Sequence, residues 1–183
     1  MSEKYKIRDQ SRQYFITFAT AGWIDVFTRR AYKDILLDSI QHCQREKGLV
    51  VYAWCLMTNH LHMIIGGNGT VRMEDIIRDL KKFTATQLCK AIENNAHESR
   101  KEWMLELFRS FGEETGKHHH YKFWQSEFHP IELSSNDMLD QRLRYIHNNP
   151  VEEGVVYEAE DYLYSSAADY GKGKKGLLEI EFV

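Results

Sequence analysis

The sequence contains few cysteines and no long hydrophobic run. Its three cysteines, Cys43, Cys55 and Cys89, are odd in number and have no C-x-x-C spacing. This argues against a disulfide framework and against a zinc site built from cysteine alone. No stretch of about 18 apolar residues is present, so we expect no membrane-spanning helix. The opening residues, Met1 to Lys4, are polar and lack the apolar core of a secretion signal, and we expect a cytoplasmic protein.

The chain also lacks a strong excess of either charge. Lys and Arg number 24 against 27 Asp and Glu over 183 residues, which leaves a net charge of −3. The whole chain therefore does not have the charge typical of a polyanion-binding protein, although binding depends on where the positive charges lie. The length suits one domain at 1–183, with a core at about 14–150 and a tail at 151–183. We find no internal repeat and no linker that would divide it.

Hydrophobic periodicity predicts the element order β-α-β-β-α. Strands are expected at 14–20, 49–57 and 60–65, and helices at 31–46 and at about 73–92. Thr58-Asn59 is expected to form the tight turn between the second and third strands. One more strand, at 121–124 or 130–133, would complete a ferredoxin-like split βαβ arrangement with an antiparallel sheet. The expected fold class is therefore α+β.

The remaining segments are polar and less regular. A short amphipathic helix is expected within 94–120, followed by a loop at 112–116 that can act as a hinge, and we expect the histidine run at 118–120 to be solvated. A last helix is predicted from Asp137 to about Asn148, capped by Ser134 to Asn136 and stopped by Pro150. The tail contains a glycine-lysine run at 171–176 that we expect to be mobile.

Two histidines in the third predicted strand are the main chemical signal. Successive strand residues point to opposite faces, so His60 and His62 point the same way, while Leu61 and Met63 point into a core. Two imidazoles fixed side by side can form a metal site. An isolated H-x-H is more often a pair of surface histidines on a half-buried strand, so a second element is needed.

The last predicted helix provides that second element. Leu139, Leu143 and Ile146 form an apolar stripe, whereas Tyr145 and Asn149 lie four residues apart on another face. Taken alone, the tyrosine is more often a packed helix residue and the asparagine a helix cap. Taken with the histidines, they indicate a cation held by two imidazoles and an amide oxygen, with open positions for a phosphodiester and a tyrosine nucleophile nearby.

Four segments, MTNHLHMII, LKKFTATQL, FWQSEF and RYIHNNPVEEGVV, together resemble the HUH single-strand DNA transposases. The similarity is greatest to the REP-associated tyrosine transposases of the insertion-sequence transposase superfamily, and it covers roughly residues 14–166. It implies Tyr145 as the nucleophile, and His60, His62 and Asn149 as ligands of Mg²⁺ or Mn²⁺. It also implies cleavage and rejoining of single-stranded DNA at hairpin-flanked sites through a 5′-phosphotyrosine intermediate.

The resemblance also suggests residues that bind the DNA. Arg78, Lys81 and Lys82 match the basic stretch of the family's second helix, and Gln125 is a candidate base contact. The alternative for the basic residues is a solvated helix face. Trp124 is either a core residue or a stacking platform for an unpaired base. The resemblance is consistent both with a homodimer that exchanges its tyrosine helices and with a monomer.

Two other functions remain open at this point. One is a domesticated protein that binds hairpin DNA without cleaving it. The other is a metal-dependent hydrolase or RNA-binding module that converged on H-x-H, which would leave the YIHNNP segment unexplained.

Overall fold

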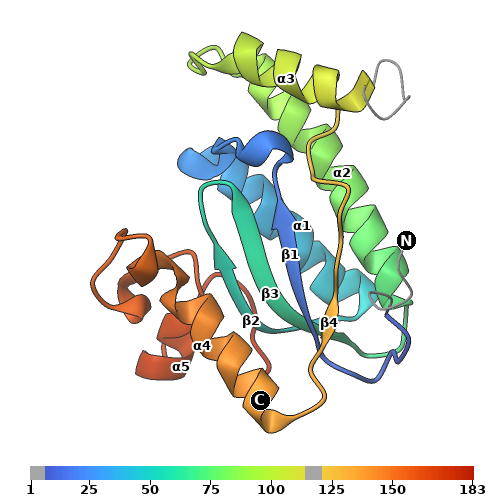
Figure 1. Ribbon diagram of the computed structural model, residues 1–183, viewed down its shortest axis with the longest axis vertical. Coiled ribbons are helices and arrows are strands. Elements are labelled where there is room, and N and C mark those ends of the chain that lie inside the picture. The colour runs from blue at the N-terminus through green and yellow to red at the C-terminus, as the bar shows by residue number, and fades with distance from the viewer. Residues whose placement is uncertain (1–6, 114–120) are drawn as a thin grey trace.

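The computed structural model describes residues 7–113 and 121–183. The main elements, in chain order, are β1 (Tyr14–Ala19), α1 (Arg30–Lys47), β2 (Leu49–Leu56), β3 (His60–Gly67), α2 (Met73–Asn94), α3 (Lys101–Glu113), β4 (Ile131–Glu132), α4 (Asn136–Glu152) and α5 (Ala167–Lys172) (Figure 1). Three short 3₁₀ turns occur at η2 (Ala21–Trp23), η3 (Val26–Thr28) and η4 (Ala159–Asp161). The predicted order of the first five elements is confirmed.

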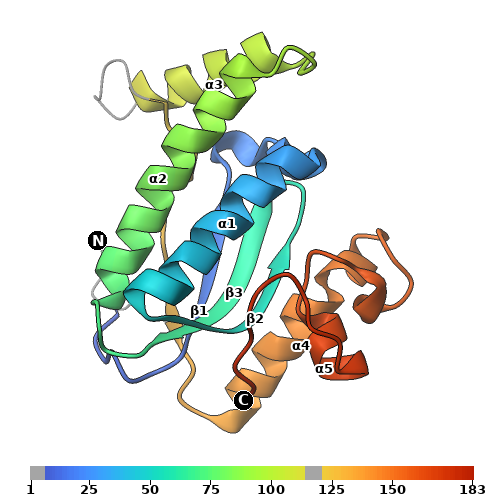
Figure 2. The same cartoon turned by 180° about the vertical axis from the view of Figure 1, so that it is seen from behind.

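The sheet has the strand order β2-β3-β1-β4, and every neighbouring pair is antiparallel. This is the split βαβ, ferredoxin-like arrangement that the sequence predicts. Helices α1 and α2 cross one face of the sheet (Figure 2), where Leu61, Met63 and Ile65 of β3 enter the larger hydrophobic core. Helix α4 covers part of the other face, where Ile146 packs with Phe15 in a smaller core. The two faces therefore have different coverings, and β3 has neighbours on both sides.

The fourth strand is divided between the two segments that the sequence singled out. Ile131 and Glu132 pair with the beginning of β1, whereas Trp124 forms an isolated bridge with Thr20 beyond its other end. Between them lies Pro130, which has no N–H to donate to a strand ladder. Both segments thus follow the same edge of β1.

Helix α4 begins as predicted but does not end as predicted. Ser135 is the N-cap, and its hydroxyl accepts a hydrogen bond from the Met138 N–H. The prediction that Pro150 stops the helix is wrong, because α4 continues to Glu152. A proline near the end of a helix removes one backbone hydrogen bond, and the next residues can still donate: the Glu153 N–H bonds to the Asn149 carbonyl at 3.0 Å. Asn149 therefore lies within the helix and not at a frayed end.

The tail packs along the sheet, and the mobility expected of residues 171–176 stays a prediction. It follows the outer edge of β2, where the Leu56 N–H donates to the Tyr164 carbonyl at 2.8 Å and the Glu181 N–H donates to the Val51 carbonyl at 3.0 Å. The predicted mobile run contributes the end of α5, and the Gly176 N–H is bonded to Asp169 at 2.8 Å. An edge strand with unpaired backbone groups is thereby covered.

Two other predictions concern residues outside the described part of the chain. These are the histidine run at 118–120 and most of the hinge loop at 112–116, of which residues 112 and 113 belong to α3. In the two described ranges, no helix has both the length and the apolar character that a bilayer span requires.

Candidate active site

Four residues from β3 and α4 meet on the sheet face that α4 covers. The Tyr145 hydroxyl lies 3.4 Å from His62 Nε2, and the Asn149 amide oxygen lies 3.3 Å from His60 Nε2. The centroids of the two imidazole rings are 4.6 Å apart. The structure thus brings together the tyrosine, both histidines and the asparagine that the sequence marks as candidates, and it does so within one chain.

Strand pairing and helix geometry explain this convergence. His62 stands in the register between Thr17 of β1 and Cys55 of β2, so it sits near the middle of the sheet. Tyr145 and Asn149 are four residues apart on α4 and share a helix face. The burial of Ile146 in the smaller core holds this helix against the sheet, which directs the shared face toward the histidines.

Polar contacts at Nδ1 orient both imidazole rings. His60 Nδ1 donates to the Asn59 side-chain oxygen at 2.7 Å, and His62 Nδ1 lies 2.8 Å from the Thr17 hydroxyl. With the proton on Nδ1, each Nε2 keeps its lone pair and directs it toward α4. At His60 this lone pair faces another acceptor, the Asn149 oxygen. Outer partners of this kind are typical of histidines that ligate metals.

Burial keeps both imidazoles neutral. Burial, with smaller contributions from the neighbouring His60 and the Arg142 guanidinium, lowers the pKa of His62 to about 3. Burial also lowers the pKa of His60, although the Asn149 oxygen, which accepts a hydrogen bond from the protonated ring, and the negative charge of Glu153 oppose this shift. Only an unprotonated imidazole nitrogen can ligate a metal, so both rings have the form that ligation needs.

Two further residues surround the tyrosine. Phe15 of β1 stacks on His62 with ring centroids 5.4 Å apart and meets Tyr145 edge-on at 6.0 Å. The Arg142 guanidinium lies 4.8 Å from the Phe15 ring and 6.0 Å from the Tyr145 ring. The Tyr145 side chain is 37% exposed, so a phosphate can reach its hydroxyl beside a positive charge.

These supporting residues were not predicted from the sequence, for different reasons. Arg142 precedes Tyr145 by three positions, a helical spacing that was available as a signal. Phe15 and Thr17 could not be found, because only the pairing of β1 with β3 places them beside the histidines.

The donor set of His60, His62 and Asn149 fits a divalent cation, although one of its three donors is an amide oxygen. In residues 7–113 and 121–183, no three His, Cys, Asp or Glu side chains form a cluster able to hold a metal. A site at this position therefore needs the amide oxygen of Asn149 together with the nitrogens of His60 and His62. Two imidazoles and one amide oxygen leave coordination positions open, as a site that binds a phosphodiester requires.

The Thr17 hydroxyl provides a test of this donor set. Thr17→Val keeps the shape and the strand propensity but removes the partner of His62 Nδ1, so we expect the affinity for Mn²⁺ to fall roughly 10- to 100-fold. Calorimetric titration with Mn²⁺ measures this change. Thr86→Val is the matched control, because the Thr86 hydroxyl donates to the carbonyl of Lys82 in its own helix, away from the histidines. An unchanged affinity in Thr17→Val would contradict the orienting role.

The candidate DNA-binding residues do not join this cluster, because α2 lies on the opposite face of the sheet. Arg78 forms ion pairs with Asp75 and Asp79, and Lys82 is exposed. Lys81 donates to the backbone carbonyl of Gln125 at 3.0 Å. Their binding of DNA stays a prediction.

Two residues of the FWQ segment support the fold. The Gln125 side chain donates to the Thr20 carbonyl at 3.2 Å. Trp124 is 5% exposed and its indole N–H donates to the Thr84 hydroxyl at 3.0 Å. Of the two interpretations of Trp124, the core residue is correct.

Lys81 should give DNA binding an unusual pH dependence. Burial lowers its pKa to about 8, so it loses most of its charge between pH 7 and pH 9, where an ordinary lysine stays charged. If Lys81 binds a phosphate, the slope of log affinity against log salt should become shallower by about 0.7 to 1 over this range. Lys81→Met should abolish the change and Lys82→Met should keep it, as salt titrations at both pH values will show. A pH effect that survives Lys81→Met would contradict the assignment.

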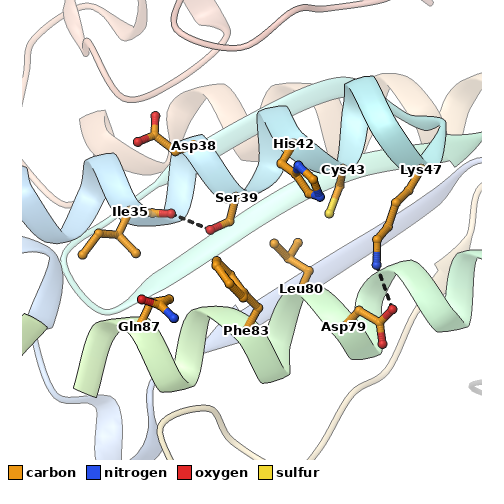
Figure 3. A pocket seen from close by; sticks show the side chains of 10 residues that line it. All are labelled: Ile35, Asp38, Ser39, His42, Cys43, Lys47, Asp79, Leu80, Phe83 and Gln87. Atoms are coloured by element: carbon orange, nitrogen blue, oxygen red, sulfur yellow. Dashed lines mark hydrogen bonds and ion pairs between the residues drawn. The ribbon is translucent and has the colours of Figure 1, made fainter. Parts of the chain in front are cut away.

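The groove between α1 and α2 is separate from this cluster (Figure 3). It lies on the side of the sheet that α1 and α2 cover, whereas the histidines point to the side that α4 covers. Three of its polar side chains have partners within the groove: Lys47 pairs with Asp79 at 2.7 Å, and the Ser39 hydroxyl donates to the Ile35 carbonyl at 2.6 Å. Nothing in this groove resembles the convergent donors beside α4, so the groove is not the candidate site.

Comparison with known proteins agrees with the fold and with membership of a transposase family. Residues 10–108 match the family described as IS200-like transposase. A solved structure of a REP-associated tyrosine transposase bound to a REP hairpin is similar with a TM-score of 0.64 and 18% identity, over 99% of this chain and 92% of that one. No curated protein matches.

A second solved structure is less similar. It is a proposed transposase from Deinococcus radiodurans R1, with 19% identity over 81% of this chain and 97% of that one, and a TM-score of 0.44, which is too low to support an argument. The family match includes β1 and the histidine pair but ends before α4. The tyrosine and asparagine therefore depend on the geometry described above.

Proposed function

Because this chain belongs to the IS200-like transposase family, we propose that it cleaves and rejoins single-stranded DNA with Tyr145 as the nucleophile. One observation carries the proposal: the Tyr145 hydroxyl lies 3.4 Å from His62 Nε2, in a cluster completed by His60 and Asn149. This combination of a phenol beside convergent, oriented donors suits phosphoryl transfer. The solved relative bound to a REP hairpin supports hairpin-flanked DNA as the substrate.

His60, His62 and Asn149 would hold Mg²⁺ or Mn²⁺. When bound, the ion supplies Lewis-acid stabilisation of the charge that develops on the phosphate oxygens. The three donors are neutral, so they leave the positive charge of the ion available to the phosphate. Thr17 and Asn59 keep the two imidazoles aimed, so little reorganisation accompanies binding.

The chemical step exchanges one phosphoester bond for another. The Tyr145 oxygen forms a bond to phosphorus and releases its proton, while the bond from phosphorus to the 3′-oxygen breaks and that oxygen takes up a proton. The products are a 5′-phosphotyrosine and a free 3′-hydroxyl, and the reverse attack by such a hydroxyl rejoins strands. Arg142, whose guanidinium lies 6.0 Å from the Tyr145 ring, would hold the scissile phosphate electrostatically beside the phenol.

A cleavage assay tests the proposal. Its substrate is labelled hairpin DNA with a single-stranded flank, whose sequence is identified by selecting the fragments of the source genome that the protein binds. The protein is mixed with this DNA and Mn²⁺ and then denatured. We expect a covalent protein–DNA band that is absent in EDTA. Binding without a band under any metal would favour the domesticated hairpin-binding protein, and turnover without a covalent intermediate would favour a hydrolase.

Because Tyr145 reaches the histidines of its own chain, the site is complete in one copy. The helix-exchanged homodimer is thus not needed to assemble it and stays a prediction, as does a cytoplasmic location.

A further inference from the structure

Trp23 has an uncommon backbone conformation for a bulky residue. Its φ is 55°, in the left-handed region, and it is the one residue other than glycine with a positive φ in the described part of the chain. The indole is 56% exposed. A large apolar side chain that is both strained and exposed is retained only where the surrounding structure enforces it, which makes a function worth testing.

Several contacts enforce this conformation. The Trp23 N–H donates to the Thr20 carbonyl at 3.0 Å, and the Trp23 carbonyl accepts from the Asn59 amide at 3.3 Å. Gly22, with a φ of 63°, lies so close to Phe111 that an added Cβ would come within 2.8 Å of its ring. The loop is therefore held against both the β2–β3 turn and α3, and its indole points outward from a rigid base.

The indole stands beside the candidate site. Its ring centroid lies 6.0 Å from that of His60, with an interplanar angle of 76°. The same Asn59 that bonds to the Trp23 carbonyl also orients His60. Trp23 thus marks the His60 end of the cluster, whereas Tyr145 stands beside His62.

We infer that Trp23 stacks on an unpaired nucleobase next to the scissile phosphate and positions the strand for attack. This inference rests on the proposed function, since it assumes that single-stranded DNA reaches Tyr145. Every base has a π-face, so a tryptophan platform binds single strands with little sequence preference. A base on the indole would fix the strand at one end of the site, while Arg142 would hold the phosphate near the other.

The other tryptophans distinguish this role from general exposure. Trp54 and Trp124 are 0% and 5% exposed and cannot offer a ring face. Trp103 is 50% exposed, but it lies on α3. It is therefore a matched control with similar exposure and no contact with the histidines.

The experiment uses the full chain carrying Tyr145→Phe, with the flanked hairpin DNA described above, in EDTA, so that binding is measured without cleavage. Trp23→Gly removes the indole and suits the left-handed backbone, so folding should be preserved. We expect it to lower the affinity between about 5-fold and about 100-fold, the range that stacking of one base implies. Trp23→Tyr should restore most of this affinity, and Trp103→Gly should leave it unchanged.

Fluorescence provides a second readout. All variants carry Tyr145→Phe. DNA should quench indole emission in the protein with this change alone and in the one that also carries Trp103→Phe. The quenching should be largely lost when Trp23→Phe is added instead. Affinity and quenching that are unchanged without the Trp23 indole would overturn the inference. So would Trp23 variants that change only the oligomeric state or the stability of the protein and not its binding of DNA. If a protein with Trp23 and Tyr145 intact forms the covalent band and Trp23→Gly does so equally well, this inference fails while the proposed function stands. If the intact protein neither binds nor cleaves the DNA, both fail.

Discussion

Tyr145→Phe should abolish the covalent protein–DNA band while leaving the protein folded and able to bind DNA. The substitution removes only the hydroxyl that lies 3.4 Å from His62 Nε2. The ring stays in place against Phe15 and His62, so the substitution preserves the packing of the side chain. Loss of a nucleophile typically lowers a rate by several orders of magnitude, so we expect at least about a thousand-fold reduction.

Denaturing gels with labelled DNA and Mn²⁺ measure the band, and thermal unfolding reports folding. Tyr157→Phe is the matched control, because Tyr157 is 96% exposed and its phenol should be dispensable. A covalent band of normal intensity in Tyr145→Phe would show that another residue is the nucleophile.

His62→Ala should give the second large effect, a loss of metal-dependent cleavage of about a hundred-fold or more. It removes a central donor of the proposed site. Since the His62 side chain is only 6% exposed and stacks on Phe15, the free energy of unfolding should also fall by about 1–3 kcal/mol. The variant should nevertheless stay folded at room temperature and bind hairpin DNA in EDTA.

A combination of measurements separates these two losses. Circular dichroism and thermal unfolding follow the fold, while titration with Mn²⁺ follows the metal. His42→Ala controls for the removal of a histidine elsewhere, because His42 lies in the groove between α1 and α2 (Figure 3). Full cleavage by a folded His62→Ala protein would remove the histidine from the proposed metal site, and global unfolding would indicate a structural histidine.

The supporting residues divide into those that a single segment can reveal and those that it cannot. Arg142 and Asn149 lie on the same α4 as Tyr145, and helical spacing alone relates them. Thr17 reaches His62 only through the register of β1 and β3, and the register of two strands separated by a helix and a further strand depends on how the whole sheet assembles. Neither helical spacing nor strand register identifies Trp23, because its exposure and its positive φ are properties of the folded loop.

By itself, the sequence determined the α+β class, the order of the first five elements along the chain, the shared face of His60 and His62, and the spacing that puts Tyr145 beside Asn149, because hydrophobic period and local spacing encode all of these. The tertiary structure alone decided that α4 lies across the histidine face, that it continues past Pro150, and that the tail covers the edge of β2. Those outcomes depend on burial and hydrogen bonding between segments far apart in the chain, for which no local pattern exists.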